Sequence, residues 1–131
     1  MSSATTPFIR HGFGAVRPYF FGHPDLLEFV KTVFGAEELE LHEMGEGFHA
    51  EVKIGDSVMV LETGIGGSPE FRTRGSVYVY VDDVDAAYQR AIALGATSLR
   101  EPADQPYEDR TAGVKDSFGN IWWIGTYIGS H

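Results

Sequence analysis

DLLEFVKTVFGAEEL, at Asp25–Leu39, returns later in the chain as DAAYQRAIALGATSL, at Asp85–Leu99. The two stretches keep one constant offset, because Asp, Gly, Ala and Leu coincide at 25 and 85, 35 and 95, 36 and 96, and 39 and 99. Each stretch has apolar residues at helical spacing and ends near a glycine that suits a left-handed helix C-terminus. The repeat therefore predicts two copies of one helix-containing module.

Short strands are predicted around each helix. They are Ala15–Phe21, Glu38–Met44, Gly47–Ile54 and Ser57–Thr63 in the first copy, and Ser76–Val81, Thr97–Arg100, Thr111–Lys115 and Asn120–Tyr127 in the second. The pattern is βαβββ twice. We predict an α+β fold in which two such modules form a mixed-sheet half-barrel around a cavity. Residues 1–14 would form an arm, 15–64 the first module, 65–75 a linker and 76–128 the second module.

Composition excludes several classes of protein. The chain of 131 residues has a formal net charge of −9, which disfavours binding to nucleic acid, and it has no cysteine for disulfides or thiolate metal sites. No apolar run is long enough to span a membrane, and the first residues do not resemble a signal peptide, so we expect a cytoplasmic protein. Open sheet edges favour a homodimer. The modules could pair within one chain or across that dimer.

Several stretches resemble a known family. The run YVDDVDAAYQRAIALGATSLREPADQPYEDRTAGVKDSFGNIWWI, from Tyr80 to Ile124, is similar to the second module of PhnB-like members of the glyoxalase / bleomycin-resistance / extradiol-dioxygenase superfamily, whose fold is called the vicinal oxygen chelate fold. The stretches VRPYFF, FVKTVFGAEEL and HAEVKIGDS agree with the first module. The resemblance covers about residues 15–128 and implies this fold with a central cavity.

The resemblance also bears on metal chemistry. Metal-dependent members carry His or Glu on the first and last strands of each module. Carried over to this chain, those positions fall on Ala15 or Val16, on Met59 with Glu62 nearby, on Ser76 or Gly75, and on Trp123. A catalytic ion needs about three protein ligands. The resemblance therefore implies the bleomycin-resistance branch, whose acidic dimers bind a basic drug with no cofactor.

Aromatic and polar residues on the predicted strands are candidate ligand contacts. Rings there would hold a flat ligand by stacking, although they could instead fill the core, which we prefer for Phe21 and Trp122. Arg17 could anchor a carboxylate or cap an Asp, Tyr107 could gate the cleft, and Arg110 could pair with Asp109 or with a ligand. The predicted contacts are Arg17, Tyr19, His49, Glu51, Glu62, Tyr78, Tyr80, Tyr107, Arg110 and Trp123. No catalytic nucleophile is indicated, and we assign no role to His11, His23 or His131.

A separate metal site is the alternative. The turn Gly45–Glu46 would place Glu40 opposite Glu51 and His42 opposite His49 across two strands. Two His and two Glu could bind Zn²⁺ or Mn²⁺ there. The other interpretation is a solvated polar face.

Three functions follow from these observations. The favoured one is a metal-independent protein that binds a small aromatic or drug-like molecule, a cationic one included, and so gives antibiotic resistance by sequestration. The second is a metal-dependent lyase, isomerase or dioxygenase that uses Glu40, His42, His49 and Glu51. The third is a structural or regulatory dimer whose cavity is filled by its own side chains.

Overall fold

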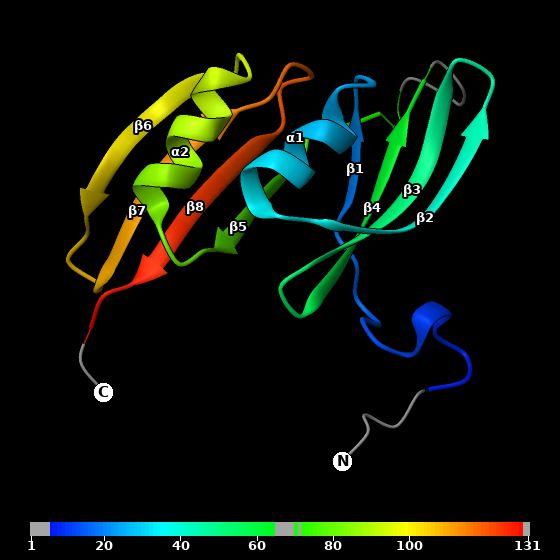
Figure 1. The fold of residues 1–131 in the computed structure, drawn as a ribbon, viewed down its shortest axis with the longest axis horizontal. Helices are drawn as coiled ribbons and strands as arrows, with labels where there is room; N and C mark the ends of the chain where they lie inside the picture. The colour runs from blue at the N-terminus through cyan, green and yellow to red at the C-terminus, as the bar shows by residue number, and fades with distance from the viewer. Residues whose placement is uncertain (1–5, 65–69, 71, 130–131) are drawn as a thin grey trace.

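The computed structural model describes residues 6–64, 70 and 72–129. The first module contains β1 (Tyr19–Gly22), α1 (Leu26–Phe34), β2 (Glu37–Met44), β3 (Gly47–Ile54) and β4 (Ser57–Thr63). The second contains β5 (Ser76–Tyr80), α2 (Val84–Ala93), β6 (Thr97–Asp104), β7 (Asp109–Lys115) and β8 (Ile121–Tyr127). The twofold βαβββ pattern is confirmed (Figure 1). Parts of the predicted arm and linker, at 1–5, 65–69 and 71, lie outside the described residues.

The two helices begin and end where the repeat predicted. At α1, Gly35 has a φ of 66° and donates its N–H to the carbonyl of Lys31, which closes the last turn. At α2, the carboxylate of Asp83 accepts a hydrogen bond of 3.1 Å from the N–H of Ala86 and so caps the first turn. Both are standard ends for an amphipathic helix that packs one face on a sheet.

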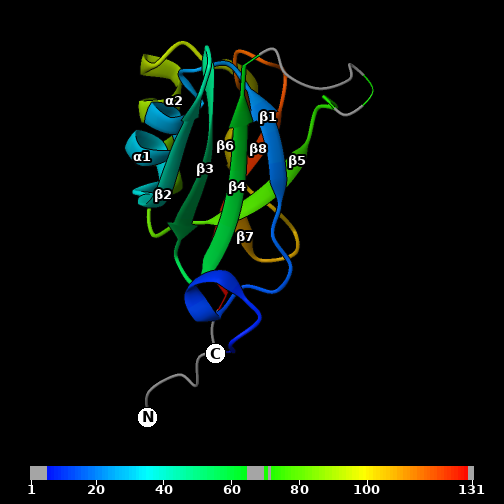
Figure 2. The ribbon, with the colours of Figure 1, turned by 90° about the vertical axis from the view of Figure 1, so that its right-hand side faces the viewer.

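Each module forms its own four-stranded sheet, with the order β1-β4-β3-β2 in one and β5-β8-β7-β6 in the other. β1 runs parallel to β4, and β5 runs parallel to β8. The remaining neighbours are antiparallel. In Figure 1, β6 and β2 lie toward the left and right sides of the molecule, and in Figure 2 the helices lie on one side of the sheets. Alternate residues of each strand therefore point to the helices or away from them.

The helix-covered faces share one hydrophobic core. Trp122 is fully buried, and its ring lies 4.9 Å from the ring of Phe20, 5.5 Å from Phe29 and 5.3 Å from Phe34, measured between centroids. The prediction that Trp122 fills the core is thus confirmed. The same prediction for Phe21 is wrong, because Phe21 points to the other face of β1 and lies beside Tyr19.

One buried side chain links the two modules by hydrogen bonds. Asn120 is 0% exposed, donates to the carbonyl of Phe21 at 2.7 Å and accepts from the N–H of Gly75 at 2.7 Å. Asn120 also donates to Asp116 at 3.0 Å, and Asp116 accepts from the indole N–H of Trp122 at 2.9 Å. These bonds join β1 to the start of β5 and β8, so the modules meet through a polar joint beside an aromatic core.

Three strand boundaries differ from the sequence prediction. β1 begins at Tyr19, so Ala15 and Arg17 precede the strand instead of lying on it. β6 continues to Asp104 through Pro102, which an edge strand tolerates because the missing N–H would have no partner there. β7 begins at Asp109 instead of Thr111, which leaves only residues 105–108 as the loop between β6 and β7.

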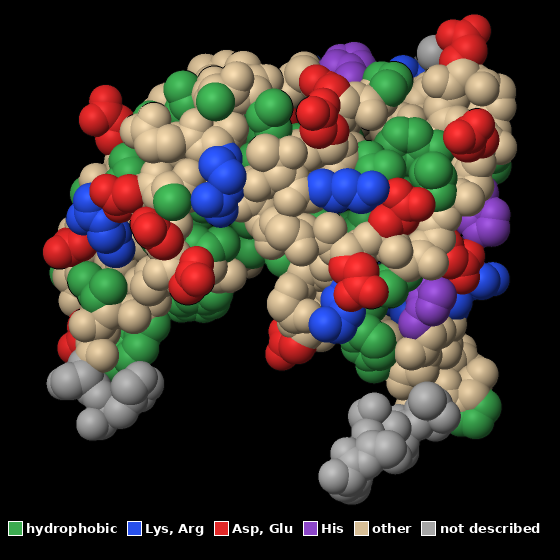
Figure 3. All heavy atoms as spheres, viewed as in Figure 1, with side chains coloured by type: hydrophobic (Ala, Val, Ile, Leu, Met, Phe, Trp, Pro, Cys, Tyr) green, Lys and Arg blue, Asp and Glu red, His purple; other side chains and the backbone are tan. Residues whose placement is uncertain are grey.

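The molecule is hollowed between its two modules on one side, as Figure 3 shows. In the part of the chain that the structure describes, no helix is long and apolar enough to cross a membrane. The cytoplasmic location stays a prediction.

Candidate functional site

The face of the second sheet that turns away from the helices carries two tyrosines beside a buried carboxylate. Tyr78 and Tyr80 alternate on β5, their ring centroids are 5.2 Å apart, and they are 39% and 62% exposed. Both phenols donate to the same oxygen, Oδ2 of Asp109, at 2.6 and 2.8 Å. Asp109 itself is only 5% exposed. We call Tyr78, Tyr80, Asp109, Thr111 and Trp123 the second open face.

Two glycines make room for rings that lie flat on this face. A Cβ at Gly125 would overlap the phenol of Tyr78, and a Cβ at Gly113 would overlap the indole of Trp123. Trp123 is the cross-strand partner of Gly113, and Tyr78 is that of Trp123. The rings therefore form a floor over the backbone of β7 and β8.

The indole of Trp123 already faces a cation. The guanidinium carbon of Arg100, on β6, lies 5.7 Å from the centre of the Trp123 ring. This distance is within the range of a cation–π contact. The floor of the second open face thus attracts positive charge within its own chain.

Hydrogen bonding and burial both affect the tyrosines. The pKa of Tyr78 is raised above its ordinary value, first by burial and then by its hydrogen bond to Asp109, since ionisation would place two negative charges side by side. The hydrogen bond to Asp109 is the main cause of the raised pKa of Tyr80. At neutral pH, both phenols therefore stay protonated and keep donating.

One polar atom next to these groups has no hydrogen-bond partner in the described part of the chain. Thr111 is 2% exposed, and its hydroxyl has no hydrogen bond among the described residues. Thr111 lies two residues from Asp109 on β7, so both side chains point to the same face. A buried hydroxyl without a partner is costly unless water or a ligand supplies one.

The corresponding face of the first sheet is more polar. Glu62 accepts from the phenol of Tyr19 at 3.0 Å and is 2.7 Å from Nδ1 of His49. Tyr19 is 51% exposed, and its ring centroid is 6.4 Å from that of His49. We call Tyr19, Phe21, His49, Glu51 and Glu62 the first open face. Among the described residues, no hydrogen bond or ring contact joins the two open faces.

The arm that precedes β1 lies against one end of the first open face (Figure 1). Arg17 donates to Glu51 Oε1 at 3.1 Å, and Arg10 donates to Glu40 Oε2 at 2.6 Å. Nε2 of His11 lies 3.1 Å from that oxygen of Glu40 and 3.4 Å from Oε1 of Glu51. Histidine, basic and acidic side chains accordingly gather on the right-hand module in Figure 3.

The strand pairing predicted for this region is confirmed. Glu40 is the cross-strand partner of Glu51, and His42 is that of His49. Within the described ranges, the ligand atoms that converge nevertheless belong to a different group, His11 with Glu40 and Glu51. Hydrogen bonding to His42 and then to Arg10 lowers the pKa of Glu40 to about 2, so this carboxylate is ionised at neutral pH.

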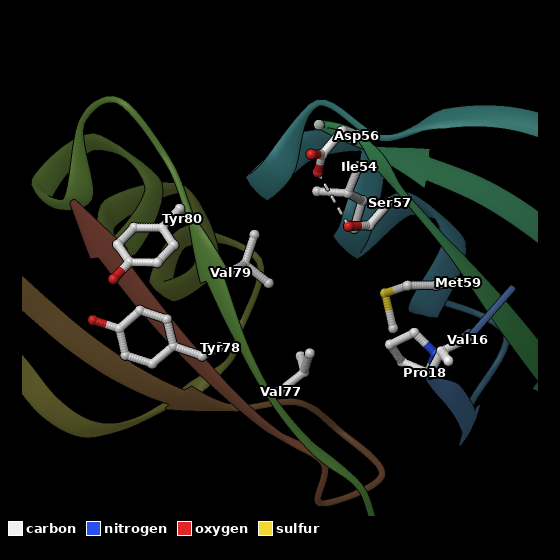
Figure 4. A pocket seen from close by; sticks show the side chains of 11 residues that line it. Val16, Pro18, Ile54, Asp56, Ser57, Met59, Val77, Tyr78, Val79 and Tyr80 are labelled. Carbon is white, nitrogen blue, oxygen red and sulfur yellow. Dashed lines mark hydrogen bonds between the residues drawn. The ribbon is translucent and has the colours of Figure 1, made fainter. Parts of the chain in front are cut away.

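A pocket of about 260 Å³ lies between the modules. Figure 4 shows Val77 and Val79 on one side, across from Met59 and Pro18. Tyr78 and Tyr80 border the pocket but point to the opposite side of β5 in this view. The pocket wall is therefore mainly aliphatic, with Asp56 and Ser57 as polar lining residues, and the rings of Tyr78 and Tyr80 lie on the other side of the strand.

Two predicted contacts lie at the margin of these sites. Arg110 pairs with Asp85 at 2.7 Å and Asp104 at 3.0 Å, which raises its pKa. The predicted ion pair with Asp109 is wrong, because adjacent residues of β7 point to opposite faces. Tyr107 is 60% exposed in the short loop between β6 and β7.

Sequence reasoning did not include His11, Arg100, Asp109 or Thr111 among the candidate site residues. Only the alternation along β7 could have placed Thr111 beside Asp109. Of the positions carried over for a metal, Ala15 lies before β1, and Met59 belongs to the hydrophobic core.

Comparison with solved structures shows the same fold. TioX from Micromonospora sp. ML1 superposes with a TM-score of 0.67 at 23% identity, covering 86% of this chain and 99% of that one. The fosfomycin resistance protein FosX from Listeria monocytogenes gives 0.62 at 15% identity, covering 90% and 94%. Glyoxalase I from Zea mays gives 0.64 at 14% identity, covering 88% and 47%. Sequence identities this low show that these proteins share the fold and nothing more.

Sequence comparison gives the family. The uncharacterized protein Rv0887c of Mycobacterium tuberculosis is 40% identical over 63 residues, which are 48% of this chain and 34% of that protein. An uncharacterized protein of Mycobacterium bovis matches equally, and there the share is 38%. The chain thus aligns with little more than a third of these curated relatives. The family model described as Glyoxalase/Bleomycin resistance protein/Dioxygenase superfamily matches residues 23–124. The chain therefore belongs to the glyoxalase/bleomycin resistance protein/dioxygenase superfamily.

Proposed function

We propose that this protein binds a small, flat aromatic or drug-like cation on its second open face, without a metal ion in the contact. One observation carries the proposal: the phenols of Tyr78 and Tyr80 converge on one oxygen of the buried Asp109 carboxylate. A phenol that donates to a carboxylate becomes more electron-rich, so its ring face attracts a cation more strongly. The surface combines stacking area with a fixed negative charge.

Three further features support a cationic ligand. Arg100 already occupies the face of Trp123, so a ligand cation would take the place of a native one. The hydroxyl of Thr111 is buried beside Asp109 without a partner among the described residues, which a ligand or bound water would supply. The net charge of −9 would attract a cation from a distance.

We further propose a homodimer that completes the site. Tyr19, Tyr78 and Tyr80 are all large aromatic side chains that a single chain leaves substantially exposed. Exposed aromatic surface of this kind is typical of a binding interface. The first open face of one copy would lie over the second open face of the other, so that Tyr19, His49 and Glu62 close the cleft. Sedimentation of the purified chain at twice the monomer mass is the expected result.

The charge dependence can be tested with two matched probes. N-methylacridinium is a permanent cation, and acridine is its neutral counterpart in mildly alkaline buffer. We expect the cation to quench Trp123 fluorescence at lower concentration than acridine. Asp109→Asn should lower the affinity for the cation by roughly tenfold, about 1.4 kcal/mol, and leave the affinity for acridine nearly unchanged. Equal affinities for both probes in the wild-type protein would contradict the proposal.

Sequestration of a basic antibiotic is the biological role that this binding would serve. FosX, which has this fold, is named as a fosfomycin resistance protein. Expression of the chain in a sensitive bacterium, with Asp109→Asn as the matched control, tests whether binding protects cells. The PhnB-like subgroup stays a prediction.

The alternative is a metal-dependent lyase, isomerase or dioxygenase of the same superfamily. The observation that favours it is the convergence of His11, Glu40 and Glu51. An enzyme of this kind would turn over substrate only when loaded with metal, whereas the proposed binding to Asp109 would withstand a chelator. The third hypothesis, a cavity filled by side chains, is disfavoured by the pocket of about 260 Å³ between the modules.

A further inference from the structure

Three side chains from separate parts of the chain point their ligand atoms at one spot beside the first open face. They are His11 from the arm, Glu40 from β2 and Glu51 from β3, and their nearest ligand atoms all lie within 4.8 Å of one another. Imidazole and carboxylate together are donors that suit Zn²⁺ and Mn²⁺. The strand positions alone do not assemble this set, because the third donor comes from the arm.

The spacing agrees with tetrahedral coordination. Ligand atoms about 2.0–2.1 Å from Zn²⁺ in a tetrahedron lie about 3.3 Å from one another. Nε2 of His11 is 3.1 Å from Oε2 of Glu40 and 3.4 Å from Oε1 of Glu51. Two of the three edges of the donor triangle therefore already have the length that a zinc site requires.

Two arginines share the same carboxylates. Arg10 contacts Oε2 of Glu40 at 2.6 Å, and Arg17 contacts Oε1 of Glu51 at 3.1 Å. An ionised carboxylate oxygen has more than one acceptor site, so a guanidinium can keep its hydrogen bond beside a metal ion. Arg10 has a side chain that is 60% exposed and can swing into solvent, whereas Arg17 is 14% exposed and is held further by the carbonyl oxygens of Phe13 and Gly14.

Further imidazoles flank the site. Nε2 of His49 lies 3.7 Å from Oε2 of Glu51, and Nε2 of His42 lies 2.7 Å from Oε1 of Glu40. Each carboxylate therefore offers one oxygen to His11 and the other to a strand histidine. A fourth ligand could come from His49 or from water, which would complete four-coordination.

We propose that His11, Glu40 and Glu51 form a transition-metal site, with Zn²⁺ as its preferred ion, that fastens the N-terminal arm to the first sheet. The site goes beyond the proposed ligand binding and shares no residue with the second open face. Of the three proposed ligands, His11 belongs to the arm and the two glutamates belong to the sheet, so a bound ion would hold the arm against the sheet. Without metal, the arm is held there by the exposed Arg10–Glu40 pair, which contributes little, and by the more buried Arg17, which bonds to Glu51 and to the arm carbonyls of Phe13 and Gly14.

Calorimetry on the untagged, EDTA-treated full chain tests the site directly. Titration with ZnCl₂ should give one ion per chain, bound more tightly than Mn²⁺. His11→Ala and Glu40→Gln should each lower the affinity for Zn²⁺ by more than roughly tenfold. Arg10→Gln should raise the affinity for Zn²⁺, because a competing cation is removed from Glu40. His23→Ala is the matched control, since its ring lies on Phe118, away from the site.

A second readout reports the arm itself. Trypsin cleaves after Arg10, whereas the bond after Arg17 is resistant because Pro18 follows it. Zn²⁺ should slow cleavage at Arg10 in the wild-type protein and in His23→Ala, but not in His11→Ala. Circular dichroism of each variant checks that the fold is retained.

The proposal is overturned if the wild-type chain binds no Zn²⁺, if folded His11→Ala binds it as the wild-type does, or if the Arg10 bond is not protected. These outcomes are independent of the ligand proposal. N-methylacridinium titrates a different face and should bind His11→Ala as it binds the wild-type protein.

Discussion

Arg100 and Trp123 form a cation–π pair on the second open face, with the guanidinium carbon 5.7 Å from the ring centre. Arg100 belongs to the edge strand β6, whereas Trp123 lies in the middle of the sheet on β8. The arginine side chain therefore reaches across β7 to cover the indole. A ligand that stacks on Trp123 must displace it.

This pair gives the first prediction. Arg100→Gln should raise the affinity for N-methylacridinium by two- to fivefold. An exposed cation–π contact contributes about 0.5–1 kcal/mol, and in this variant the ligand does not have to break the contact between Arg100 and Trp123. The quenching of Trp123 fluorescence measures it. Neutral acridine should gain less. An unchanged or weaker affinity for the cation would mean that the ligand does not use this ring.

The second prediction concerns Gly113. A methyl group there would push against the indole of Trp123, and the backbone does not require a positive φ at this position, so the effect is steric alone. Gly113→Ala should shift the emission of Trp123 and weaken N-methylacridinium by roughly tenfold, while overpacking costs about 1–3 kcal/mol of stability. Fluorescence and urea denaturation check the two parts separately. Unaltered emission and binding would show that the ring floor is not the ligand surface.

The third prediction is a pH dependence. The pKa of Tyr78 is raised in the folded protein above the ordinary value of 10.0. Folding then favours the protonated phenol, so its stabilisation is complete below about pH 10 and is lost as the pH rises through the folded-state pKa. In Tyr78→Phe, the free energy of unfolding should fall less steeply between neutral and strongly alkaline pH. Urea denaturation at both ends of the range gives the comparison, and parallel losses in both proteins would argue against the role of Tyr78.

The fourth prediction tests the joint between the modules. Asn120→Ala removes the bonds that this buried side chain makes to the backbone of Phe21 and Gly75, together with its bond to the carboxylate of Asp116. Leaving those backbone groups unsatisfied should cost about 2–4 kcal/mol. Urea denaturation measures it, with the exposed Gln89→Ala on α2 as a control that stays within about 0.5 kcal/mol. A loss as small as that of the control would mean that water replaces these bonds.

Much of the fold could be predicted because local rules determine it. The repeat gave two modules, and Gly35 marked the end of α1. The pairing of Glu40 with Glu51 and of His42 with His49 followed from the tight turn at Gly45–Glu46, since a short turn sets the register of its strands.

The site was harder to predict, for two physical reasons. His11 lies on the arm, and no strand or helix period indicates where an arm lies on the body. The strand that carries Arg100 was predicted to end at that residue, so the position of Arg100 over Trp123 could not be foreseen. Asp109 is a different case. Alternation along a strand separates it from Arg110, and applying that rule would have pointed it toward Tyr78 and Tyr80 instead.

Trp122 and Trp123 are neighbours in sequence, yet one lies in the shared core and the other on the second open face. Folding depends on the first ring, and the proposed ligand binding depends on the second. A lineage can therefore replace Trp123 and its surroundings to accept a new compound while the interior stays intact. Selection for stability and selection for chemical preference act on opposite sides of the same strands, which leaves this architecture free to diversify.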